Sequence, residues 1–423
     1  MKQGKSFERI SVIGLGYIGL PTAAAFAQRK IQVIGVDVNE GAVATINRGE
    51  IHIVEPDLDD AVYRAVNEGY LRATTAPQPA DAFLIAVPTP FKGDNHDPDL
   101  SYIEAASRMI APVLKSGDLV VLESTSPVGA TEQMATWMAN LRPDLSFPQH
   151  KGEHSDIRVA HCPERVLPGH VMRELVSNDR IIGGMTDRCA QVACDLYRIF
   201  VEGECLLTDS RTAEMSKLAE NAFRDINIAY ANELSIVCDR LGINAWEMIA
   251  LANRHPRVNI LQPGPGVGGH CIAVDPWVIA SSAPDHTPLI RTARAVNGGK
   301  PDWVLEQVEQ QVQAFVSDTG TEPVVAALGL TFKADIDDMR ESPALYIAQQ
   351  LCARHGQRFI AVEPYVERKP GSLSPGSFMP LEKAVEQADI LVCLVKHRPF
   401  KEYFSASPLP AGKRLLDMVG MNG

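Results

Sequence analysis

The chain of 423 residues is 45% hydrophobic and 22% charged, a balance that is typical of globular proteins and excludes extensive disorder. Its formal net charge of -12 excludes non-specific nucleic-acid binding, because a phosphate backbone attracts a basic surface. The first ten residues lack the apolar core of a signal peptide and no uncharged apolar stretch could span a bilayer, so we expect a cytoplasmic protein without a membrane partner. Eight cysteines without a Cys-x-x-Cys pair indicate reduced thiols and no metal site.

A glycine motif opens the chain. The apolar run 10–13 leads into Gly14-Leu-Gly16-Tyr-Ile-Gly19, a helical pattern follows, and the next apolar run ends in Asp37, which is 18 residues after Gly19. In a strand–turn–helix unit such glycines allow a tight turn and close approach to a pyrophosphate, and the acid binds the adenosine ribose. The motif predicts NAD rather than NADP, the alternative being a glycine turn without a ligand.

A long helix is predicted in the middle of the chain. Residues 211–241 contain neither Gly nor Pro, and Gly242 stands where a helix C-cap is expected. Lys217, Asn221 and Arg224 lie at positions i, i+4 and i+7, so they share one face of that helix. The face is either a site or simply solvated.

A glycine-rich segment, residues 263–271, ends in Cys271, and Asp275 follows four residues later. Cys271 and Asp275 would face the same side if a helical turn starts there. A thiol near cations can ionise and attack an aldehyde, whereas a buried structural cysteine is the alternative interpretation. His270 receives no catalytic role.

The last hundred residues repeat the pattern of the first. Residues 329–343 occupy the place of the glycine motif but lack its glycine spacing, and they carry Lys333 and Arg340 as cations at a ligand edge or as plain surface charges. We therefore predict an α/β fold with two Rossmann-like parallel-sheet domains joined by a helical middle that contains one long central helix. The domain boundaries are placed at 1–208, 209–316 and 317–423.

Together these segments resemble the UDP-glucose/GDP-mannose dehydrogenase family over essentially the whole chain. The resemblance implies an NAD-binding domain at 1–208, a central dimerisation domain with the catalytic Lys and Cys at 209–316, and a UDP-binding domain at 317–423. It also implies a homodimer or a higher homo-oligomer. The motifs that carry it are Gly14-Leu-Gly-Tyr-Ile-Gly-Leu-Pro21, Val87-Pro-Thr-Pro90, Ser124-Thr125, Pro163-Glu164-Arg165, Glu214-Met-Ser-Lys217-Leu-Ala-Glu-Asn221, residues 264–275 and residues 329–343.

The resemblance also implies roles for individual residues. Cys271 would be the nucleophile and Glu164 the base for thioester hydrolysis, while His255 and Arg257 would reach the substrate of the neighbouring subunit. The implied catalytic residues are Cys271, Lys217, Glu164, Asn221, Asp275 and Thr125. The implied cofactor contacts are Gly14, Gly16, Tyr17, Ile18, Gly19, Asp37, Thr89, Thr125 and Arg340. The implied substrate contacts are Arg165, Val166, Lys217, Asn221, Arg224, His255, Arg257, Gly268 and Lys333.

The implied reaction is a two-step, four-electron oxidation of a UDP-sugar at C6 by NAD. Residues 162–169 and 254–264 are similar to those of family members that act on UDP-N-acetyl-D-mannosamine, whose product enters bacterial surface polysaccharide such as enterobacterial common antigen. UDP-glucose and UDP-N-acetylglucosamine are alternative substrates. A β-hydroxyacid-type dehydrogenase with one hydride transfer and a non-catalytic nucleotide-sugar sensor are the remaining alternatives.

Overall fold

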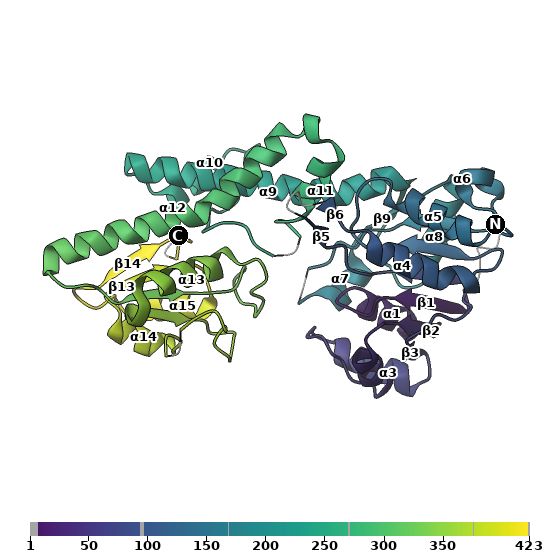
Figure 1. Cartoon of the computed structure of the whole chain (residues 1–423), viewed down its shortest axis with the longest axis horizontal. Coiled ribbons are helices and arrows are strands. Elements are labelled where there is room, and N and C mark those ends of the chain that lie inside the picture. The colour runs from purple at the N-terminus through teal and green to yellow at the C-terminus, as the bar shows by residue number, and fades with distance from the viewer. Residues whose placement is uncertain (1–6, 94–96, 168, 270, 375, 422–423) are drawn as a thin grey trace. The chain divides into compact units, whose positions relative to one another are not determined.

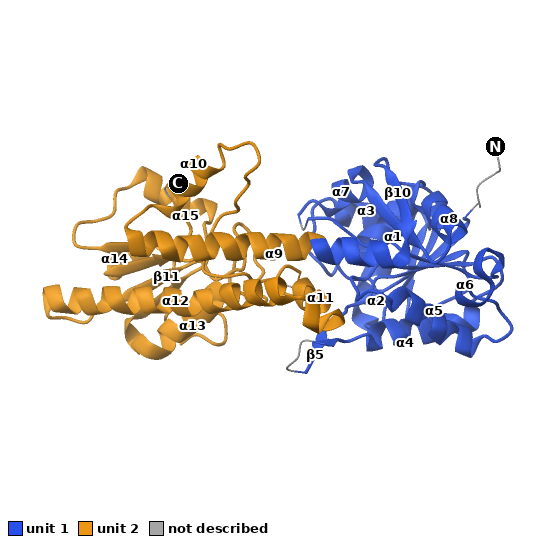
Figure 2. Ribbon diagram, turned by 90° about the horizontal axis from the view of Figure 1, so that it is seen from above, with its two compact units in different colours: residues 1–219 blue, residues 220–423 orange. Residues whose placement is uncertain are grey.

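The computed structural model describes residues 7–93, 97–167, 169–269, 271–374 and 376–421. The chain divides into two compact units, residues 1–219 and residues 220–423 (Figures 1 and 2). The long helix α9 (Ser210–Leu241) contains the boundary between the units. The three-domain division at 1–208, 209–316 and 317–423 stays a prediction.

The first unit is built on a sheet whose strands run in the order β10-β9-β8-β7-β4-β1-β2-β3 among the described residues. The pairs from β8 to β3 are parallel, as predicted, but β9 is antiparallel to β8 and β10 is parallel to β9. The end of β8 and the start of β9 lie at the same end of the sheet, so the connection between them needs no crossover. The strands are β1 (Arg9–Ile13), β2 (Gln32–Val36), β3 (Leu71–Thr74), β4 (Ala82–Ile85), β7 (Leu119–Leu122), β8 (Arg158–His161), β9 (Arg180–Gly184) and β10 (Cys205–Asp209).

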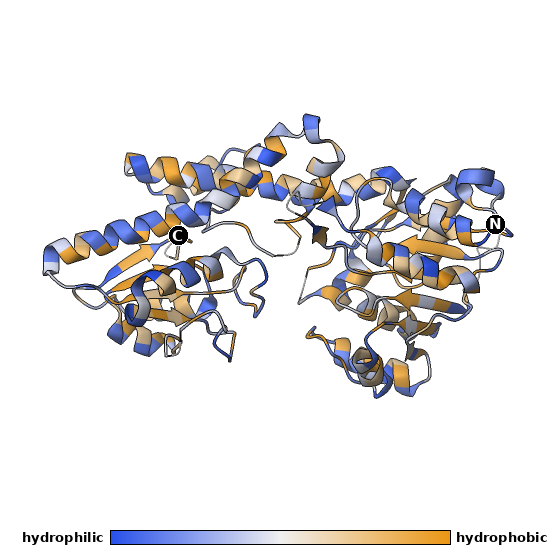
Figure 3. Ribbon diagram, in the orientation of Figure 1, coloured by the Kyte–Doolittle hydropathy of each residue, from blue (hydrophilic) through white to orange (hydrophobic). Residues whose placement is uncertain are grey.

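Helices cover both faces of this sheet. Successive strand residues point to opposite faces, so Leu84 belongs to one apolar cluster while Phe83 and Ile85 belong to the other. Figure 3 colours the strands largely as hydrophobic, as expected for a sheet that is buried on both sides. The helices are α1 (Gly19–Gln28), α2 (Glu40–Asn47), α3 (Leu58–Asn67), α4 (Ser101–Ile110), α5 (Ala130–Leu141), α6 (Pro148–Lys151), α7 (Val171–Ser177) and α8 (Asp187–Tyr197), with short turns at Ala111–Val113 and Gly152–His154 and a small hairpin of β5 (Phe91–Lys92) and β6 (Asp97–Pro98).

The second unit contains a parallel sheet in the order β12-β11-β13-β14, with helices on both faces. Helix α12 (Pro288–Thr319) precedes this sheet in the chain. The strands are β11 (Val325–Leu328), β12 (Phe359–Val362), β13 (Ile390–Cys393) and β14 (Arg414–Asp417). The remaining helices are α10 (Ala245–Ala252), α11 (Asp275–Ser282), α12 (Pro288–Thr319), α13 (Pro343–His355), α14 (Leu381–Gln387) and α15 (Arg398–Ala406), with short turns at Pro284–His286 and Gly356–Arg358.

The predicted long helix is confirmed, together with both of its ends. The carboxylate of Asp209 accepts a hydrogen bond from the Thr212 N–H over 2.9 Å, which satisfies a backbone donor in the first turn. Gly242 has a φ of +66°, and the following N–H, that of Ile243, donates to the Cys238 carbonyl over 2.8 Å. This left-handed glycine ends the helix in the way that the sequence predicted.

The two sheets share one loop geometry, as the internal repeat of the sequence suggested. In the first unit the Leu15 N–H donates to the Asp37 carboxylate over 2.9 Å. In the second unit the Leu330 N–H donates to the Glu363 carboxylate over 2.7 Å. Each acid follows the second strand of its sheet and fixes the loop that follows the first strand.

Candidate active site

The glycine loop of the first unit leaves room for a ligand only at its middle glycine. Gly14 has a φ of +89°, and a Cβ there would lie 2.6 Å from the Ala86 carbonyl oxygen. A Cβ on Gly19 would lie 1.8 Å from the Gly14 carbonyl oxygen, so both positions require glycine. A Cβ on Gly16 would meet nothing within 4 Å among the described residues, which keeps the backbone open to a pyrophosphate at the start of α1.

Asp37 follows β2 beside this loop. One carboxylate oxygen accepts the Leu15 N–H and the other accepts the Asn39 N–H, both over 2.9 Å. Each carboxylate oxygen can accept a further hydrogen bond, so the oriented acid can also receive ribose hydroxyls. Tyr17 is 48% exposed on the same loop, and Ile18 is the residue before α1. The loop and the acid therefore fit the adenosine half of a dinucleotide.

Two threonines predicted for the cofactor site lie side by side in the first unit. The Thr89 hydroxyl donates to the Thr125 carbonyl oxygen over 2.6 Å. The neighbouring Ser124 hydroxyl donates to the Val87 carbonyl oxygen over 2.7 Å. These bonds join the loops that follow β4 and β7 at one edge of the sheet, which is the edge where open α/β sheets bind ligands.

Glu214 fixes the start of α9, and sequence reasoning gave this residue no role of its own. Its carboxylate accepts the Gly129 N–H over 2.6 Å, the Thr131 N–H over 2.8 Å and the Thr131 hydroxyl over 2.6 Å. Burial raises the pKa of Glu214, while these hydrogen bonds oppose the shift. Lys217 follows one helical turn later and is partly exposed, so Glu214 orients the turn that carries it. The sequence signal that could have revealed Glu214 was its position three residues before Lys217 in the same family motif.

Glu164 lies in the loop after β8 and is held from two sides. One carboxylate oxygen lies 2.8 Å from the Arg180 guanidinium, and the other accepts the Arg165 N–H over 2.7 Å. The Arg165 side chain donates to the Asp179 carbonyl oxygen over 2.7 Å, and Val166 packs against the core. The loop that bears the predicted base is therefore docked on the residues that precede and begin β9.

In the second unit the predicted residues Asn221 and Asp275 meet. The Asn221 side-chain amide donates to the Asp275 carboxylate over 2.5 Å, and these residues are 6% and 4% exposed. Cys271 is exposed, and its carbonyl oxygen accepts the N–H groups of Val274 and Asp275 over 3.0 and 2.9 Å. A helical turn thus starts at Cys271, which is the condition under which Cys271 and Asp275 share a side.

The glycine-rich segment before Cys271 packs on the 329–343 loop. A Cβ on Gly268 would lie 2.3 Å from the Glu341 carbonyl oxygen, and a Cβ on Gly269 would lie 2.8 Å from the Phe332 ring. The Gly269 N–H also donates to the Arg340 carbonyl oxygen over 3.2 Å. Close packing explains the glycines and puts the cysteine-bearing segment beside the loop that contains Lys333 and Arg340.

The remaining predicted residues lie near the surface. Arg224 is exposed on α9, and His255 and Arg257 are exposed after α10, where the Arg257 N–H donates to His255 Nδ1 over 3.3 Å. Lys333 is exposed. The Arg340 guanidinium forms an ion pair with Asp338. Their roles stay predictions, and His270 lies outside the described residues.

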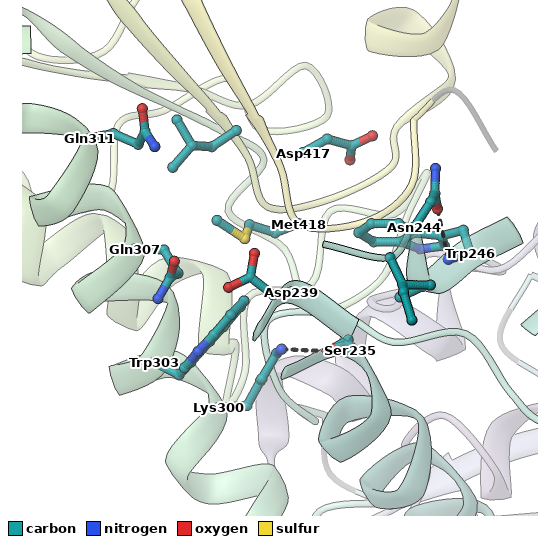
Figure 4. Close-up of a pocket in the computed structure, with 13 residues that line it drawn as sticks. Ser235, Asp239, Asn244, Trp246, Lys300, Trp303, Gln307, Gln311, Asp417 and Met418 are labelled. Carbon is teal, nitrogen blue, oxygen red and sulfur yellow. Dashed lines mark hydrogen bonds between the residues drawn. The ribbon is translucent and has the colours of Figure 1, made fainter. Parts of the chain in front are cut away.

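A separate pocket of about 240 Å³ opens in the second unit (Figure 4). The buried Lys300 donates to the Ser235 hydroxyl over 2.6 Å, and its ammonium lies 3.7 Å from the centre of the Trp303 ring. Burial lowers the pKa of Lys300 to about 7, against the attraction of Asp239. Among the described residues, none of the predicted site residues lines this pocket, so we do not assign it to the reaction.

Family models match the chain in three consecutive segments. Residues 8–201 match the NAD binding domain of the UDP-glucose/GDP-mannose dehydrogenase family, residues 211–298 match its central domain and residues 326–420 match its UDP binding domain. The chain belongs to the UDP-glucose/GDP-mannose dehydrogenase family. It is accordingly an NAD-dependent oxidoreductase, and its UDP binding domain supports a UDP-sugar as the substrate class.

Relatives within the family carry two different sugar names. The NDP-N-acetyl-D-galactosaminuronic acid dehydrogenase of Ralstonia nicotianae is 64% identical over 94% of this chain and 92% of its own length. The UDP-N-acetyl-D-mannosamine dehydrogenase of Yersinia pestis is also 64% identical, over 94% of this chain and 95% of its own length. A solved UDP-D-ManNAc dehydrogenase from Pyrococcus horikoshii has a TM-score of 0.86 at 40% identity and covers 98% of this chain and 96% of its own.

The family assignment confirms the predictions of fold class, enzyme class and cofactor. The predicted site residues are not tested by it and stay predictions. In the part of the chain that the structure describes, no helix combines the length and the apolar character that a membrane crossing requires.

Proposed function

We propose that this family member oxidises the C6 alcohol of UDP-N-acetyl-D-mannosamine to a carboxylate through a thioester on Cys271. The product is UDP-N-acetyl-D-mannosaminuronate. The observation that carries the proposal is the second-unit arrangement in which exposed Cys271 begins the helical turn of Asp275, and Asp275 is bonded to Asn221. A protein that only binds a nucleotide sugar would not need an oriented nucleophile.

The first oxidation converts the C6 alcohol to an aldehyde. Bound NAD would supply the acceptor for the hydride lost in this oxidation and for the hydride lost in the next. Lys217 and Asn221, together with Thr125 and a water molecule, handle the hydroxyl proton and stabilise the negative charge that develops on the C6 oxygen. Glu214 supports this step because it fixes the first turns of α9.

Covalent catalysis by Cys271 prepares the second oxidation. The thiolate forms a C–S bond with the aldehyde carbon, and the aldehyde oxygen takes up a proton to give a thiohemiacetal. Loss of the remaining C6 hydrogen as hydride, and of the hydroxyl proton, leaves a thioester. The thiolate is the reactive form of the cysteine in this step.

Hydrolysis releases the product. Glu164 takes a proton from water, the water oxygen forms a bond with the thioester carbon, the C–S bond breaks and Cys271 leaves as a thiolate. The overall reaction consumes one water and two NAD molecules for each sugar. The Arg165 N–H donates to the Glu164 carboxylate and so helps to orient it for this role.

NAD and the UDP-sugar are assigned to two different sets of residues. We assign the cofactor to the glycine loop, Asp37, Thr89 and Thr125, because the loop is open at Gly16 and the acid is oriented. The UDP-sugar is assigned to the Arg165 loop, Arg224, Gly268 and Lys333. Cofactor contacts are also assigned to Tyr17, Ile18 and Arg340, and sugar contacts to Val166.

A second copy of the chain completes the proposal. Phe223, Tyr230 and Val237 on α9 are 66%, 52% and 46% exposed, and we call them the α9 stripe. They are seven residues apart, so they lie along one side of the helix, and exposed apolar side chains of this kind mark interaction surfaces. We propose a homodimer or higher homo-oligomer that buries the α9 stripe, with His255 and Arg257 contacting the substrate of the neighbouring copy. We also propose that the enzyme is cytoplasmic and supplies a surface polysaccharide of the enterobacterial common antigen type.

A specific observation supports a second candidate for the sugar of the substrate. The relative from Ralstonia nicotianae is named for an N-acetyl-D-galactosaminuronic acid, and it is as similar to this chain as the relative named for mannosamine. The same chemistry on an N-acetylgalactosamine nucleotide is therefore the second candidate. UDP-glucose and UDP-N-acetylglucosamine remain further alternatives.

The test is the amount of NADH formed per mole of sugar at completion, with the UDP derivatives of N-acetylmannosamine, N-acetylgalactosamine, N-acetylglucosamine and glucose as parallel substrates. We expect two NADH from the mannosamine sugar. Two NADH from another sugar alone would keep the mechanism and correct the substrate. One NADH per sugar would contradict the thioester route.

A further inference from the structure

Arg180 faces Glu164 because of the one antiparallel pairing in the described part of the large sheet. Residue 160 pairs with residue 184 and residue 161 with residue 183 between β8 and β9. Continuing that register by three residues sets residue 164 against residue 180. A parallel β9 would put Arg180 at the opposite end of the sheet, so the reversal of the strand brings the cation to the predicted base.

The Arg180 side chain is enclosed in a fixed position. It is 3% exposed, and one guanidinium nitrogen lies 2.8 Å from the Glu164 carboxylate. The guanidinium also lies over the rings of Tyr197 and Phe200, at 5.1 and 5.7 Å from their centres. Aromatic faces attract a guanidinium, so the rings hold the cation in the orientation that meets Glu164.

A second carboxyl group belongs to the same buried cluster. Glu123 is 2% exposed, and it accepts the Tyr197 hydroxyl over 2.6 Å. Burial raises the pKa of Glu123 to about 7, while Arg180 and the Tyr197 hydroxyl oppose the shift and Glu164 adds to it. The thiol of Cys162, with its sulfur 4.0 Å from Arg180, has its pKa raised by burial to about 12 and is therefore neutral.

The charges of this cluster depend on Arg180. Burial opposes the charged guanidinium, but the neighbouring acidic groups outweigh burial and raise the pKa of Arg180, so it is a cation. Arg180 is ion-paired with Glu164, and its charge also attracts Glu123. Two carboxylates in a buried site repel each other, and without the cation at least one of them would take up a proton.

We propose that Arg180 is a positioning residue for thioester hydrolysis, which holds the Glu164 carboxylate in one orientation and keeps it available as the base. The inference rests on the proposed function of Glu164. Arg180 does not touch the reacting atoms; it acts through Glu164. Its loss should slow hydrolysis of the thioester and leave formation of the thioester much less affected.

The experiment follows the covalent adduct on Cys271 by intact-protein mass spectrometry during turnover, together with the pH profile of kcat. Glu164→Gln is the reference and should accumulate the adduct. Arg180→Met should also accumulate it, with kcat lower by about 100-fold, in the range of a lost general base, and with the acid side of the pH profile moved to higher pH. Arg180→Lys should recover part of kcat, because it restores the cation.

Two further variants separate positioning from folding. Arg180→Met/Glu123→Gln removes one of the two carboxylates along with the cation, so it should fold more readily and still accumulate the adduct. Arg158→Met changes another buried arginine, at the opposite end of β8, where it bonds to Ser155. It should accumulate no adduct and leave the pH profile unchanged.

The outcomes distinguish the two proposals. If Glu164→Gln accumulates the adduct but neither Arg180 variant does, the role of Arg180 is wrong and the proposed function stands. If the Arg180 variants only lose activity to the same extent as Arg158→Met, with an unchanged pH profile, the role is also wrong. If Glu164→Gln itself accumulates no adduct, the proposed function fails and the inference fails with it.

Discussion

The side-chain amide of Asn221 donates a hydrogen bond to the carboxylate of Asp275 over 2.5 Å, although 54 residues separate them in the sequence. Both side chains are almost fully buried, on α9 and at the start of α11. A charged group in such a place is stable only when hydrogen bonds replace the water that it has lost. The bond therefore fixes the helical turn of Cys271 relative to α9.

Replacing Asn221 by Ala should lower both stability and turnover. Removing a donor from a buried carboxylate costs about 1–3 kcal/mol, so we expect a lower thermal unfolding midpoint. The fall in kcat should be larger than the loss of folded protein alone explains, because the same amide is proposed to act on the C6 oxygen. The measurements are the unfolding midpoint and kcat.

Asn227 provides the matched control on the same helix. Its amide nitrogen donates to the Asn259 carbonyl oxygen over 3.1 Å, and its amide oxygen accepts the Leu261 N–H over 3.0 Å. The side chain is partly exposed, so water can replace the lost bonds. Asn227→Ala should therefore change the midpoint less and leave kcat near that of the unaltered enzyme. Equal effects of the two substitutions would show that the Asn221–Asp275 bond has no special importance.

The sequence predicts the local relations within this arrangement, but it does not predict the tertiary contact between Asn221 and Asp275. Helical spacing places Lys217 and Asn221 on one face, and the same rule places Cys271 and Asp275 on one side of a turn, because both relations are set within a few residues. That Asn221 meets Asp275 depends on how α9 packs against α11. No periodicity of the chain encodes that packing.

The same reasoning explains why Arg180 was missed. An apolar strand has the same alternation whether its neighbour is parallel or antiparallel, so the pattern could not reveal the reversal of β9. The glycine loop, by contrast, was predicted from sequence, because Gly14 and Gly19 are required by backbone contacts that recur in every strand–turn–helix unit of this kind.

Replacing Cys271 by Ser should abolish turnover while binding of the UDP-sugar is retained. A hydroxyl at this position has almost the same size as the thiol but is a far weaker nucleophile, so we expect kcat to fall by about 1,000-fold or more. Steady-state NADH formation and calorimetric titration with the sugar nucleotide measure the two effects. Cys205→Ser, at a partly exposed cysteine of β10, is the control and should keep full activity. Full activity of Cys271→Ser would remove the covalent step.

Acid should destabilise the first unit through His161. This side chain is fully buried in β8, neither ring nitrogen has a hydrogen-bond partner among the described residues, and burial lowers its pKa from 6.5 to about 3. The unfolded chain binds a proton near pH 6.5 and the folded chain does not, so stability falls as the pH drops from 6.5 towards 3. The loss relative to pH 7 amounts to about 2 kcal/mol at pH 5.

His161→Leu should remove this part of the pH dependence. Urea unfolding at pH 7 and pH 5 gives the comparison, and the difference between the two pH values should be smaller in the variant by about 2 kcal/mol. The exposed His150 on α6 serves as the control, and His150→Leu should leave the difference as it is. An unchanged difference in His161→Leu would mean that His161 can bind a proton in the folded protein.

Replacing Tyr230 by Glu should separate the proposed oligomer into monomers. Tyr230 is the middle member of the α9 stripe, between Phe223 and Val237, and a charge there would have to be buried against the second copy without a partner. Sedimentation equilibrium measures the mass, and Tyr63→Glu changes an equally exposed tyrosine, 58% against 52%, on α3 as the control. If His255 and Arg257 contribute to the neighbouring copy, kcat/KM of the Tyr230→Glu monomer should also fall and depend on protein concentration. An oligomer that survives Tyr230→Glu with its mass unchanged would place the subunit contact on another surface.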